Sequence, residues 1–336
     1  MKRDVSFAGP AGRDATGRHF PSVPEDRSEF AEAARFYLQL EPRQLPSRFL
    51  YDALGSALFD AICHLPWYRI TRSELQLLQR HAVAIGQKFR DGGRVVELGC
   101  GNGEKLATLL THADVRGVHA HLIDLSDAAL GQSVRALGSI ENLDLRVTAH
   151  QATYEDGLLA LPTDDPHPTL LALLGSNIGN FDPPGASAFL DLMRAAIRAR
   201  DYLLPGADLV KPERELLLAY DDPLGLTAAF NKNLLLRMNA ELGADFDLSR
   251  FAHRAVWNRV ASRVEMHLVS LADQEVDVAD AEFRFRLQDG ETIWTESSYK
   301  YEPASIRELV EPAGFVQRNQ WIDEGARFAL TLFEAV

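Results

Sequence analysis

The order of apolar and polar positions along the chain predicts an alternating α/β core. Strands are predicted over residues 94–99, 120–125, 144–150, 169–175 and 202–210. Helical spacing of apolar residues predicts helices over 103–112, 127–137 and 185–199. Strands that alternate with helices of this length pair in parallel through right-handed crossovers. A ligand is then expected beyond the carboxyl ends of the strands.

A helical region precedes this core. Apolar residues recur at helical spacing over 28–40 and again over 55–63. A third helix is predicted to start at Thr71 and to end near Phe89. Thr71 is a good capping residue, and Glu74 three positions later completes the sequence pattern of a capping box.

The pattern changes again after the fifth strand. A helical stretch over 213–242 is followed by alternating strands within 259–298, where Asp289-Gly290 predicts a hairpin turn. The α/β pattern then resumes with a helix at 303–312 and strands at 316–322 and 327–334. A second unit is therefore expected as an insertion before the last part of the sheet.

Composition narrows the function classes. The 336 residues carry a net charge of −13, with 46% hydrophobic and 25% charged residues, as in a soluble globular protein. A main partner of nucleic acid or anionic membrane would need a basic face, so neither is expected. The two cysteines, Cys63 and Cys100, form no metal-ligand or disulfide pattern. No apolar stretch is as long as a membrane span, and the N-terminal residues contain no apolar core of signal-peptide length. We expect a cytoplasmic protein that is a monomer.

The most informative motif follows the first strand of the core, where Glu97 precedes three glycines at alternate positions, Gly99, Gly101 and Gly103. Such a turn lets the backbone come close to a ligand. The spacing differs from the Gly-x-Gly-x-x-Gly of a dinucleotide site. It suits a ligand without phosphate at this turn, and S-adenosylmethionine (SAM) is the leading candidate. An ordinary glycine turn and a nicotinamide dehydrogenase are the alternatives.

An acidic residue strengthens this interpretation. Asp124 closes the second strand of the core, about 23–25 residues after the glycines. An acid at this place in a βαβ unit is positioned to bind ribose hydroxyls.

Further polar segments are richer than core packing requires. The segment 174–181 leaves the fourth strand with two glycines and two asparagines, and Asn180 is placed to present its amide to a substrate. In the segment 295–301, Glu296 and Ser298 share one face of a strand, where a carboxylate and a hydroxyl together can grip a polar ring. The plainer interpretations are a turn asparagine and a solvated strand end.

Several long motifs in one order make the chain recognisable. They are Phe49-Leu50-Tyr51-Asp52-Ala53, Glu97-Leu98-Gly99-x-Gly101-x-Gly103-Glu104-Lys105, Ile178-Gly179-Asn180, Asp208-Leu209-Val210-Lys211, Ala219-Tyr220-Asp221-Asp222, Arg263-Val264-Glu265-Met266 and Thr295-Glu296-Ser297-Ser298-x-Lys300-Tyr301. With these motifs the chain resembles the SAM-dependent histidine Nα-methyltransferases of ergothioneine biosynthesis over nearly all of residues 45–336. It departs from that family at Arg69-Ile70, Asn177 and Pro212, and the first and last departures leave open the conformation of the loop that carries Tyr68.

The resemblance implies a role for each matching residue. Asn180 and Tyr220 would hold the substrate carboxylate, Tyr51 and Tyr68 would close over the substrate, and Tyr68 and Asn180 would be the catalytic residues. The substrate-binding residues are then Tyr51, Tyr68, Gly175, Asn180, Tyr220, Met266, Glu296 and Ser298. The cofactor-binding residues are Glu97, Gly99, Gly101, Gly103, Lys105, Asp124, Thr153 and Tyr154, and no metal ligands are expected.

The expected fold is a Rossmann-like class I SAM methyltransferase sheet with an inserted α+β substrate-binding domain. Residues 71–210 and 299–336 are assigned to the SAM-binding domain, 25–70 and 211–298 to a substrate-binding or lid domain, and 1–24 to a flexible N-terminal arm. The expected reaction is sequential in-line methyl transfer to the α-amino group of L-histidine, giving hercynine. The sequence leaves open whether a carbonyl, a water or Tyr68 takes the amine proton. The alternatives are an N-methyltransferase of another aromatic amino acid, such as a tryptophan derivative, and a SAM-binding sensor without turnover.

Overall fold

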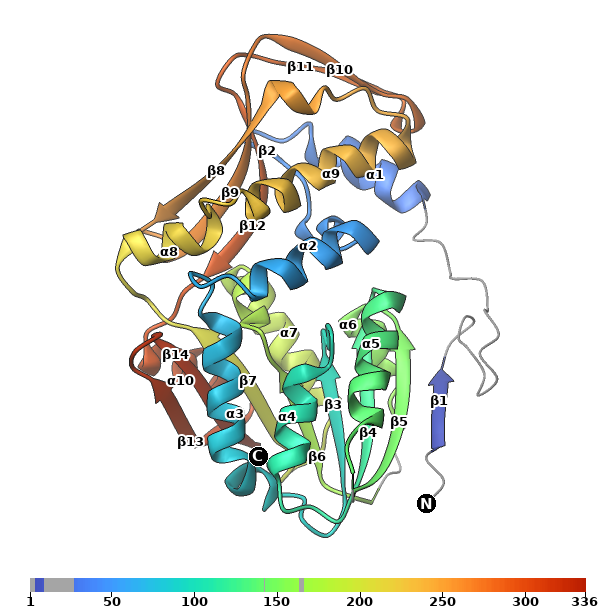
Figure 1. Cartoon of the computed structure of the whole chain (residues 1–336), viewed down its shortest axis with the longest axis vertical. Helices are drawn as coiled ribbons and strands as arrows, with labels where there is room; N and C mark the ends of the chain where they lie inside the picture. Colours follow the sequence, from blue (N-terminus) through green and yellow to red (C-terminus); the bar gives the residue numbers. More distant parts are fainter. Residues whose placement is uncertain (1–3, 9–26, 142, 163–165) are drawn as a thin grey trace. The chain divides into compact units, whose positions relative to one another are not determined.

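The computed structural model describes residues 4–8, 27–141, 143–162 and 166–336, and the chain within them forms two compact units. The first unit contains Ile70–Val210 and Lys300–Val336 together with the N-terminal segment that carries strand β1. The second unit contains Val23–Arg69 and the insertion Lys211–Tyr299. The parts are drawn in Figure 1.

An eight-stranded sheet forms the centre of the first unit, in the order β1-β5-β4-β3-β6-β7-β14-β13. Its strands are β1 (Asp4–Ala8), β3 (Gly93–Leu98), β4 (Gly117–Asp124), β5 (Asp144–Gln151), β6 (Thr169–Leu173), β7 (Tyr202–Asp208), β13 (Phe315–Asp323) and β14 (Phe328–Ala335). The strands from β1 to β7 pair in parallel, and β14 runs antiparallel to both of its neighbours. The predicted Rossmann-like α/β sheet is confirmed.

The strand order reverses between β3 and β6, which are direct neighbours. In open α/β sheets, ligands bind outside the carboxyl ends of the strands at such a switch point. The glycine turn after β3 and the segment after β6 therefore lie beside each other.

Helices cover both faces of this sheet. They are α3 (Ile70–Gly86), α4 (Glu104–His112), α5 (Asp127–Gly138), α6 (Tyr154–Leu159), α7 (Pro183–Ala195) and α10 (Pro303–Val310). In Figure 1, α3, α4 and α5 stand next to one another along the sheet. The sequence analysis did not predict α6, a helix of six residues that is too short to show a helical apolar period.

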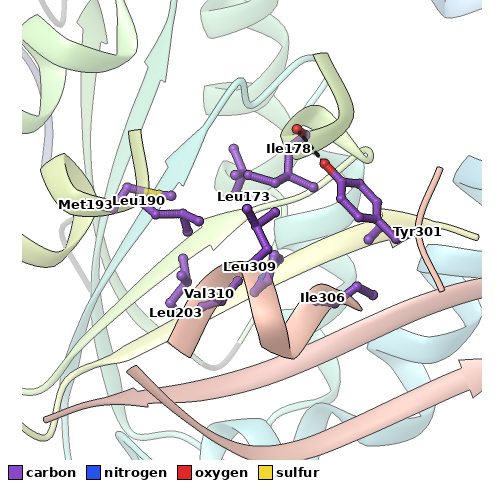
Figure 2. Close-up of a pocket in the computed structure, with 11 residues that line it drawn as sticks. Leu173, Ile178, Leu190, Met193, Leu203, Tyr301, Ile306, Leu309 and Val310 are labelled. Atoms are coloured by element: carbon purple, nitrogen blue, oxygen red, sulfur yellow. Dashed lines mark hydrogen bonds between the residues drawn. The ribbon is translucent and has the colours of Figure 1, made fainter. Parts of the chain in front are cut away.

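A small apolar gap remains between the sheet and helices α7 and α10 (Figure 2). Its lining includes Leu173 of β6, Leu203 of β7 and Val310 of α10, and these side chains belong to the buried core. The one hydroxyl there, on Tyr301, donates to the backbone carbonyl of Ile178 at 3.1 Å. We interpret this gap as a packing defect of the core, because it presents no further polar group to a ligand.

The second unit combines four helices with a four-stranded sheet. The helices are α1 (Arg27–Tyr37), α2 (Ala53–Cys63), α8 (Glu213–Tyr220) and α9 (Leu226–Leu242). The sheet has the order β2-β12-β9-β8, with β2 (Arg43–Gln44), β8 (Phe251–Asn258), β9 (Arg263–Ser270) and β12 (Thr292–Tyr299). A separate antiparallel pair is formed by β10 (Gln274–Val278) and β11 (Phe283–Leu287). Helix α9 packs against α1, α2, β8 and β9, which explains why so much of its surface is apolar.

One prediction in this unit was wrong. Asp289-Gly290 does turn the chain, with Gly290 at φ +81°, but the strands on either side do not pair with each other. Strand β11 pairs with β10, whereas β12 pairs with β9. The Gly290 amide instead donates to the carbonyl of Ser270 at 2.9 Å, so the turn joins two different sheets. Turn chemistry specifies a local bend and not the partner of each strand.

Three strands were not predicted, β1, β2 and β8, and β2 is only two residues long. Strand β8 carries partly exposed side chains along most of its length, so its sequence lacks a clear alternation. Strand β1 lies within the predicted flexible arm, 1–24, and pairs in parallel with β5. The other residues assigned to that arm lie outside the described residues.

The start of α3 also differs from the prediction. The helix begins at Ile70, so Thr71 lies inside its first turn and does not cap it. Glu74 is consequently not part of a capping box, and its side chain is fully buried in the first unit. None of the helices in the described part of the chain is long and apolar enough to cross a membrane.

A cluster of imidazoles lies on one face of β4 and β5. His121 Nδ1 lies 3.0 Å from His150 Nε2, and His119 Nε2 lies 2.9 Å from Thr148 Oγ1. The rings of His119 and His121 are 4.1 Å apart. Burial, together with the nearby His119, lowers the pKa of His150. Charging His150 therefore opposes folding.

We expect the folded first unit to lose stability as the pH falls below about 6.5, the ordinary pKa of an unfolded histidine. Below that pH the unfolded chain binds a proton at His150 before the folded chain does, so acid favours unfolding. His150→Gln should lose about 0.5–1 kcal/mol less than the wild type between pH 7 and 5.5. Urea unfolding followed by circular dichroism measures this.

The matched control is His167→Gln, which removes an exposed imidazole from the same unit. The change of slope in His150→Gln should exceed that in His167→Gln. An unchanged slope in His150→Gln would show that the cluster does not govern acid sensitivity.

Candidate active site

The glycine turn after β3 has the geometry of a close-approach turn. Gly99, Gly101 and Gly103 have φ values of +73°, +53° and +78°, in the region that favours glycine. A Cβ at Gly103 would lie 2.5 Å from the Cα of Ser133 in α5. A Cβ at Gly101 would meet no atom of the described residues within 4 Å. Gly103 is thus required by helix packing, while Gly101 borders open space.

Asp124 is tied to this turn from the end of β4. Its Oδ2 accepts the Gly101 amide at 3.1 Å, and its Oδ1 accepts the Ser126 amide at 2.9 Å. Burial raises the pKa of the Asp124 carboxyl, and the two amide contacts work against that rise. The carboxylate is therefore held in a fixed orientation at the carboxyl end of β4.

Glu97 is the most unusual group at this end of the sheet. Its side chain is 1% exposed, and its Oε2 has no hydrogen-bond partner among the described residues. The pKa of Glu97 is raised to about 8, chiefly by burial; Lys105 works against this rise, and Glu74 and Asp124 contribute to it. A buried acceptor of this kind is costly unless a donor fills it. A cationic ligand group beside Glu97 would restore its charge and satisfy the orphaned oxygen.

Glu74 contacts this group, and the sequence analysis missed it. Its carboxylate accepts the Gly175 amide at 2.8 and 3.0 Å and pairs with Lys105 Nζ at 2.9 Å. The sequence signal that points to it is Gly206, a glycine within strand β7. A Cβ there would lie 1.9 Å from Glu74 Oε1, and glycine inside a strand often marks such a close approach.

The segment after β6 forms a short 3₁₀ turn, Asn177–Asn180, that is anchored on two sides. Ser176, at φ +61°, accepts the Asp208 amide at 2.9 Å through its Oγ. Figure 2 shows Tyr301 reaching the carbonyl of Ile178 on this turn. Asn180, at the end of the turn, is exposed. The anchored backbone presents the Asn180 amide outward from the first unit.

Thr153 and Tyr154 follow β5. Thr153 caps α6 by accepting the Asp156 amide at 3.1 Å, so its hydroxyl has a structural use. Tyr154 stacks on Phe189 with ring centroids 5.6 Å apart, and burial raises the pKa of its phenol. The Asn177 amide donates to the Tyr154 hydroxyl at 3.4 Å. Tyr154 thus provides a fixed aromatic wall beside the glycine turn, since a Cβ at Gly99 would lie 2.5 Å from its hydroxyl.

In the second unit, the pairing of β9 with β12 sets the polar face. Glu296 lies opposite Met266, and Ser298 lies opposite Val264. A bulge at Thr295 separates these pairs from the rest of β12. Directly paired residues share a face, so the Glu296 carboxylate and the Ser298 hydroxyl lie on the face that carries Met266.

Tyr220 reaches Ser298 from the end of α8. Its hydroxyl donates to Ser298 Oγ at 2.8 Å, a buried contact. The resemblance implies that Tyr220 contacts the substrate carboxylate. In the structure, its hydroxyl bonds to Ser298. Tyr220 is thus placed to orient the hydroxyl beside Glu296.

Aromatic rings line the same region of the second unit. The ring of Tyr51 lies 5.6 Å from Phe59 and 5.5 Å from Phe230, and the ring of Tyr68 lies 6.1 Å from Phe59 and 6.5 Å from Tyr220. Burial, followed by Tyr220, Cys63, Tyr51 and Glu296, raises the pKa of the Tyr68 phenol well above its ordinary value. This environment disfavours the ionised phenolate of Tyr68.

The predicted residues form two groups, one in each unit. The first unit carries Glu97, Gly99, Gly101, Gly103, Lys105, Asp124, Thr153, Tyr154, Gly175 and Asn180. The second unit carries Tyr51, Tyr68, Tyr220, Met266, Glu296 and Ser298. Within the described residues, no cluster of three or more His, Cys, Asp or Glu side chains is arranged to hold a metal ion.

Known proteins are similar in sequence to this chain over most of its length. Histidine N-alpha-methyltransferases of Mycobacterium tuberculosis and Mycolicibacterium smegmatis are 36% and 37% identical over 297 residues, which are 88% of this chain and 91% of each relative. Ergothioneine biosynthesis protein 1 of Schizosaccharomyces pombe is 31% identical over 282 residues, 81% of this chain and 36% of that longer protein.

A family model described as histidine-specific, SAM-dependent methyltransferase matches residues 30–335. That match extends through both units, so it includes the glycine turn with Asp124 as well as Glu296 and Ser298. The chain belongs to the family of SAM-dependent, histidine-specific methyltransferases.

Proposed function

We propose that this protein transfers three methyl groups in succession from SAM to the α-amino group of L-histidine, giving hercynine. The observation that carries the substrate assignment is the buried Tyr220–Ser298 contact beside Glu296 on one face of β12. Membership of the histidine-specific family and the names of the two bacterial relatives support the same substrate. The S. pombe relative supports a place in ergothioneine biosynthesis.

Ring chemistry explains why this pair suits histidine. A neutral imidazole has one N–H donor and one bare nitrogen that accepts. An ionised Glu296 only accepts, and the Ser298 hydroxyl is able to donate, so the two groups complement both ring nitrogens. An indole has a single N–H and no acceptor, which would leave the hydroxyl unmatched. A buried polar group without a partner costs about 1–3 kcal/mol, enough to disfavour the tryptophan alternative.

The cofactor side is assigned to the first unit. Bound SAM supplies an electrophilic methyl group on a sulfonium. We assign Asp124 to the ribose hydroxyls and Tyr154 to the border of the adenine. Glu97 is assigned to the ammonium of the amino-acid portion, because its buried Oε2 lacks a partner among the described residues. The open side of Gly101 leaves the backbone room to approach this ligand.

Asn180 and Tyr68 are assigned orienting roles. The exposed Asn180 amide has the chemistry to hold the substrate carboxylate. Tyr68, whose raised pKa keeps its phenol protonated, is proposed to donate a hydrogen bond and not to take the amine proton. The amine must then arrive neutral or lose its proton to a carbonyl or a water. Fixing the reactants in line supplies several kcal/mol of the barrier, about 7–11 in ideal cases.

We also propose that the protein is a cytoplasmic monomer. Both cysteines are free, as expected in a reducing compartment. The acidic net charge of −13 supports a small-molecule substrate over nucleic acid or anionic membrane.

Mass spectrometry of the purified protein with SAM tests the main proposal. L-histidine should gain one, two and then three methyl groups, while L-tryptophan and L-tyrosine offered alongside should gain none. Methylation of another amino acid instead would overturn the roles of Glu296 and Ser298. SAM binding without turnover on any of them would favour the sensor.

Glu296→Ala should weaken histidine binding about tenfold or more, because an imidazole N–H would lose a charged acceptor. SAM affinity should change less than about twofold. Calorimetric titration of each ligand measures both values. The matched control is Glu275→Ala on strand β10 of the same unit, which should leave both affinities unchanged. Equal losses for both ligands in Glu296→Ala would contradict the assignment.

The two glycines of the turn provide a second matched pair. Gly103→Ala should destabilise the protein by roughly 2 kcal/mol or more, because the new methyl overlaps the backbone of α5 and φ is positive. Gly101→Ala should cost only about 1 kcal/mol of strain yet weaken SAM binding, since its methyl enters the open space. Thermal unfolding and SAM titration separate the effects. Normal SAM affinity in Gly101→Ala would show that SAM does not occupy the open space beside Gly101.

A further inference from the structure

We propose that Glu74 is a positioning residue of the cofactor site: it holds Lys105 and the Gly175 turn in place and thereby keeps Glu97 available to a cationic ligand group. This inference rests on the proposed assignment of SAM to the first unit. Neither the capping pattern of the sequence nor the family description gives Glu74 such a role.

One carboxylate joins three separate segments. Glu74 projects from α3, its two oxygens both accept the Gly175 amide after β6, and its Oε2 pairs with Lys105 in the first turn of α4. Glu74 is fully buried, whereas the Lys105 side chain is 22% exposed. The contact therefore anchors a partly exposed ammonium from its buried side.

Two glycines make room for this pair. A Cβ at Gly206 would lie 1.9 Å from Glu74 Oε1, and a Cβ at Gly175 would lie 2.8 Å from Lys105 Nζ. Glycine within a strand weakens it, because there is no side chain to pack and more entropy to lose. Glycine at position 206 weakens strand β7 locally, but it leaves room for the Glu74 carboxylate at the end of the strand.

Stability alone does not account for such a pair. A buried ion pair often contributes no more than well-packed apolar residues of similar volume would, because both charges lose their hydration. Lys105 is near enough to Glu97 to lower its pKa, while Glu74 raises it. Without the Glu74 charge, Lys105 would turn toward Glu97 and occupy the carboxylate that the ligand needs.

The three side chains thus act in sequence. Glu74 draws Lys105 to one side, so that Glu97 Oε2 keeps no partner among the described residues. The ammonium of a ligand is then the cation that Glu97 receives. The same Glu74 carboxylate fixes the Gly175 amide at the start of the segment that leads to Asn180. A substitution that removes only the charge should affect the cofactor, and one that removes the whole group should affect both ligands.

Glu74→Gln is the decisive variant, because its amide oxygen still accepts the Gly175 N–H while the negative charge is gone. The SAM dissociation constant and the KM for SAM should rise about tenfold, the scale of one charge-assisted contact. The KM for histidine and kcat should stay within about twofold. Glu74→Ala should also raise the KM for histidine, since it releases the Gly175 turn.

The double variant Glu74→Gln/Lys105→Met isolates the mechanism. If Glu74 acts through Lys105, its substitution should add less than about twofold to the SAM dissociation constant once Lys105 is already Met. Glu308→Gln, at an exposed position of α10 in the same unit, is the control for loss of one negative charge and should match the wild type.

Gly206→Ala tests the proposal without any change of charge and serves if Glu74→Gln does not fold. Its methyl should displace the Glu74 carboxylate and reproduce the selective loss of SAM affinity. Unchanged SAM affinity in folded Glu74→Gln or Gly206→Ala would overturn the proposal. A wild-type protein that binds no SAM would instead overturn the cofactor assignment, so the two failures are distinguishable.

Discussion

The first unit depends on one constraint: the carboxyl ends of β3 and β6 must meet where the strand order reverses. Both strands end in glycines with positive φ, and the two turns are joined through Glu74, Lys105 and Gly175. Parallel pairing brings these segments together although they are about 75 residues apart in sequence. Glu97, Lys105 and Gly175 take their positions from this meeting point.

The second unit solves a different problem, which is to orient a carboxylate and a hydroxyl on one face of a sheet. The register of β9 against β12 places Glu296 opposite Met266, and the bulge at Thr295 adjusts the strand just before it. Thr295 itself is buried, and its hydroxyl donates to Asn231 of α9 at 2.6 Å. Helix α9 thereby fixes the strand, and Tyr220 fixes the Ser298 hydroxyl. Contacts from α8 and α9 thus hold the polar side chains of β12 in place.

The sequence by itself determined the parallel core and the family. Strands β3 to β7 match the five predicted ranges, 94–99, 120–125, 144–150, 169–175 and 202–210. They could be predicted because strands buried on both faces are rich in apolar residues. The glycine spacing with Asp124 indicated the cofactor class, since a close backbone approach requires glycine at fixed positions. These features are local, and local features can be seen in a single segment.

Only the tertiary structure decided which distant groups meet. Glu74 looked like half of a capping box and is instead bonded to Gly175, 101 residues further on. The Tyr220 hydroxyl of α8 meets Ser298 of β12, 78 residues further on, and the turn at Gly290 joins two sheets instead of forming one hairpin. In each case the local pattern fixed the bend or the residue type. The partner was chosen by long-range packing and by the need to satisfy buried polar groups, which no short stretch of sequence records.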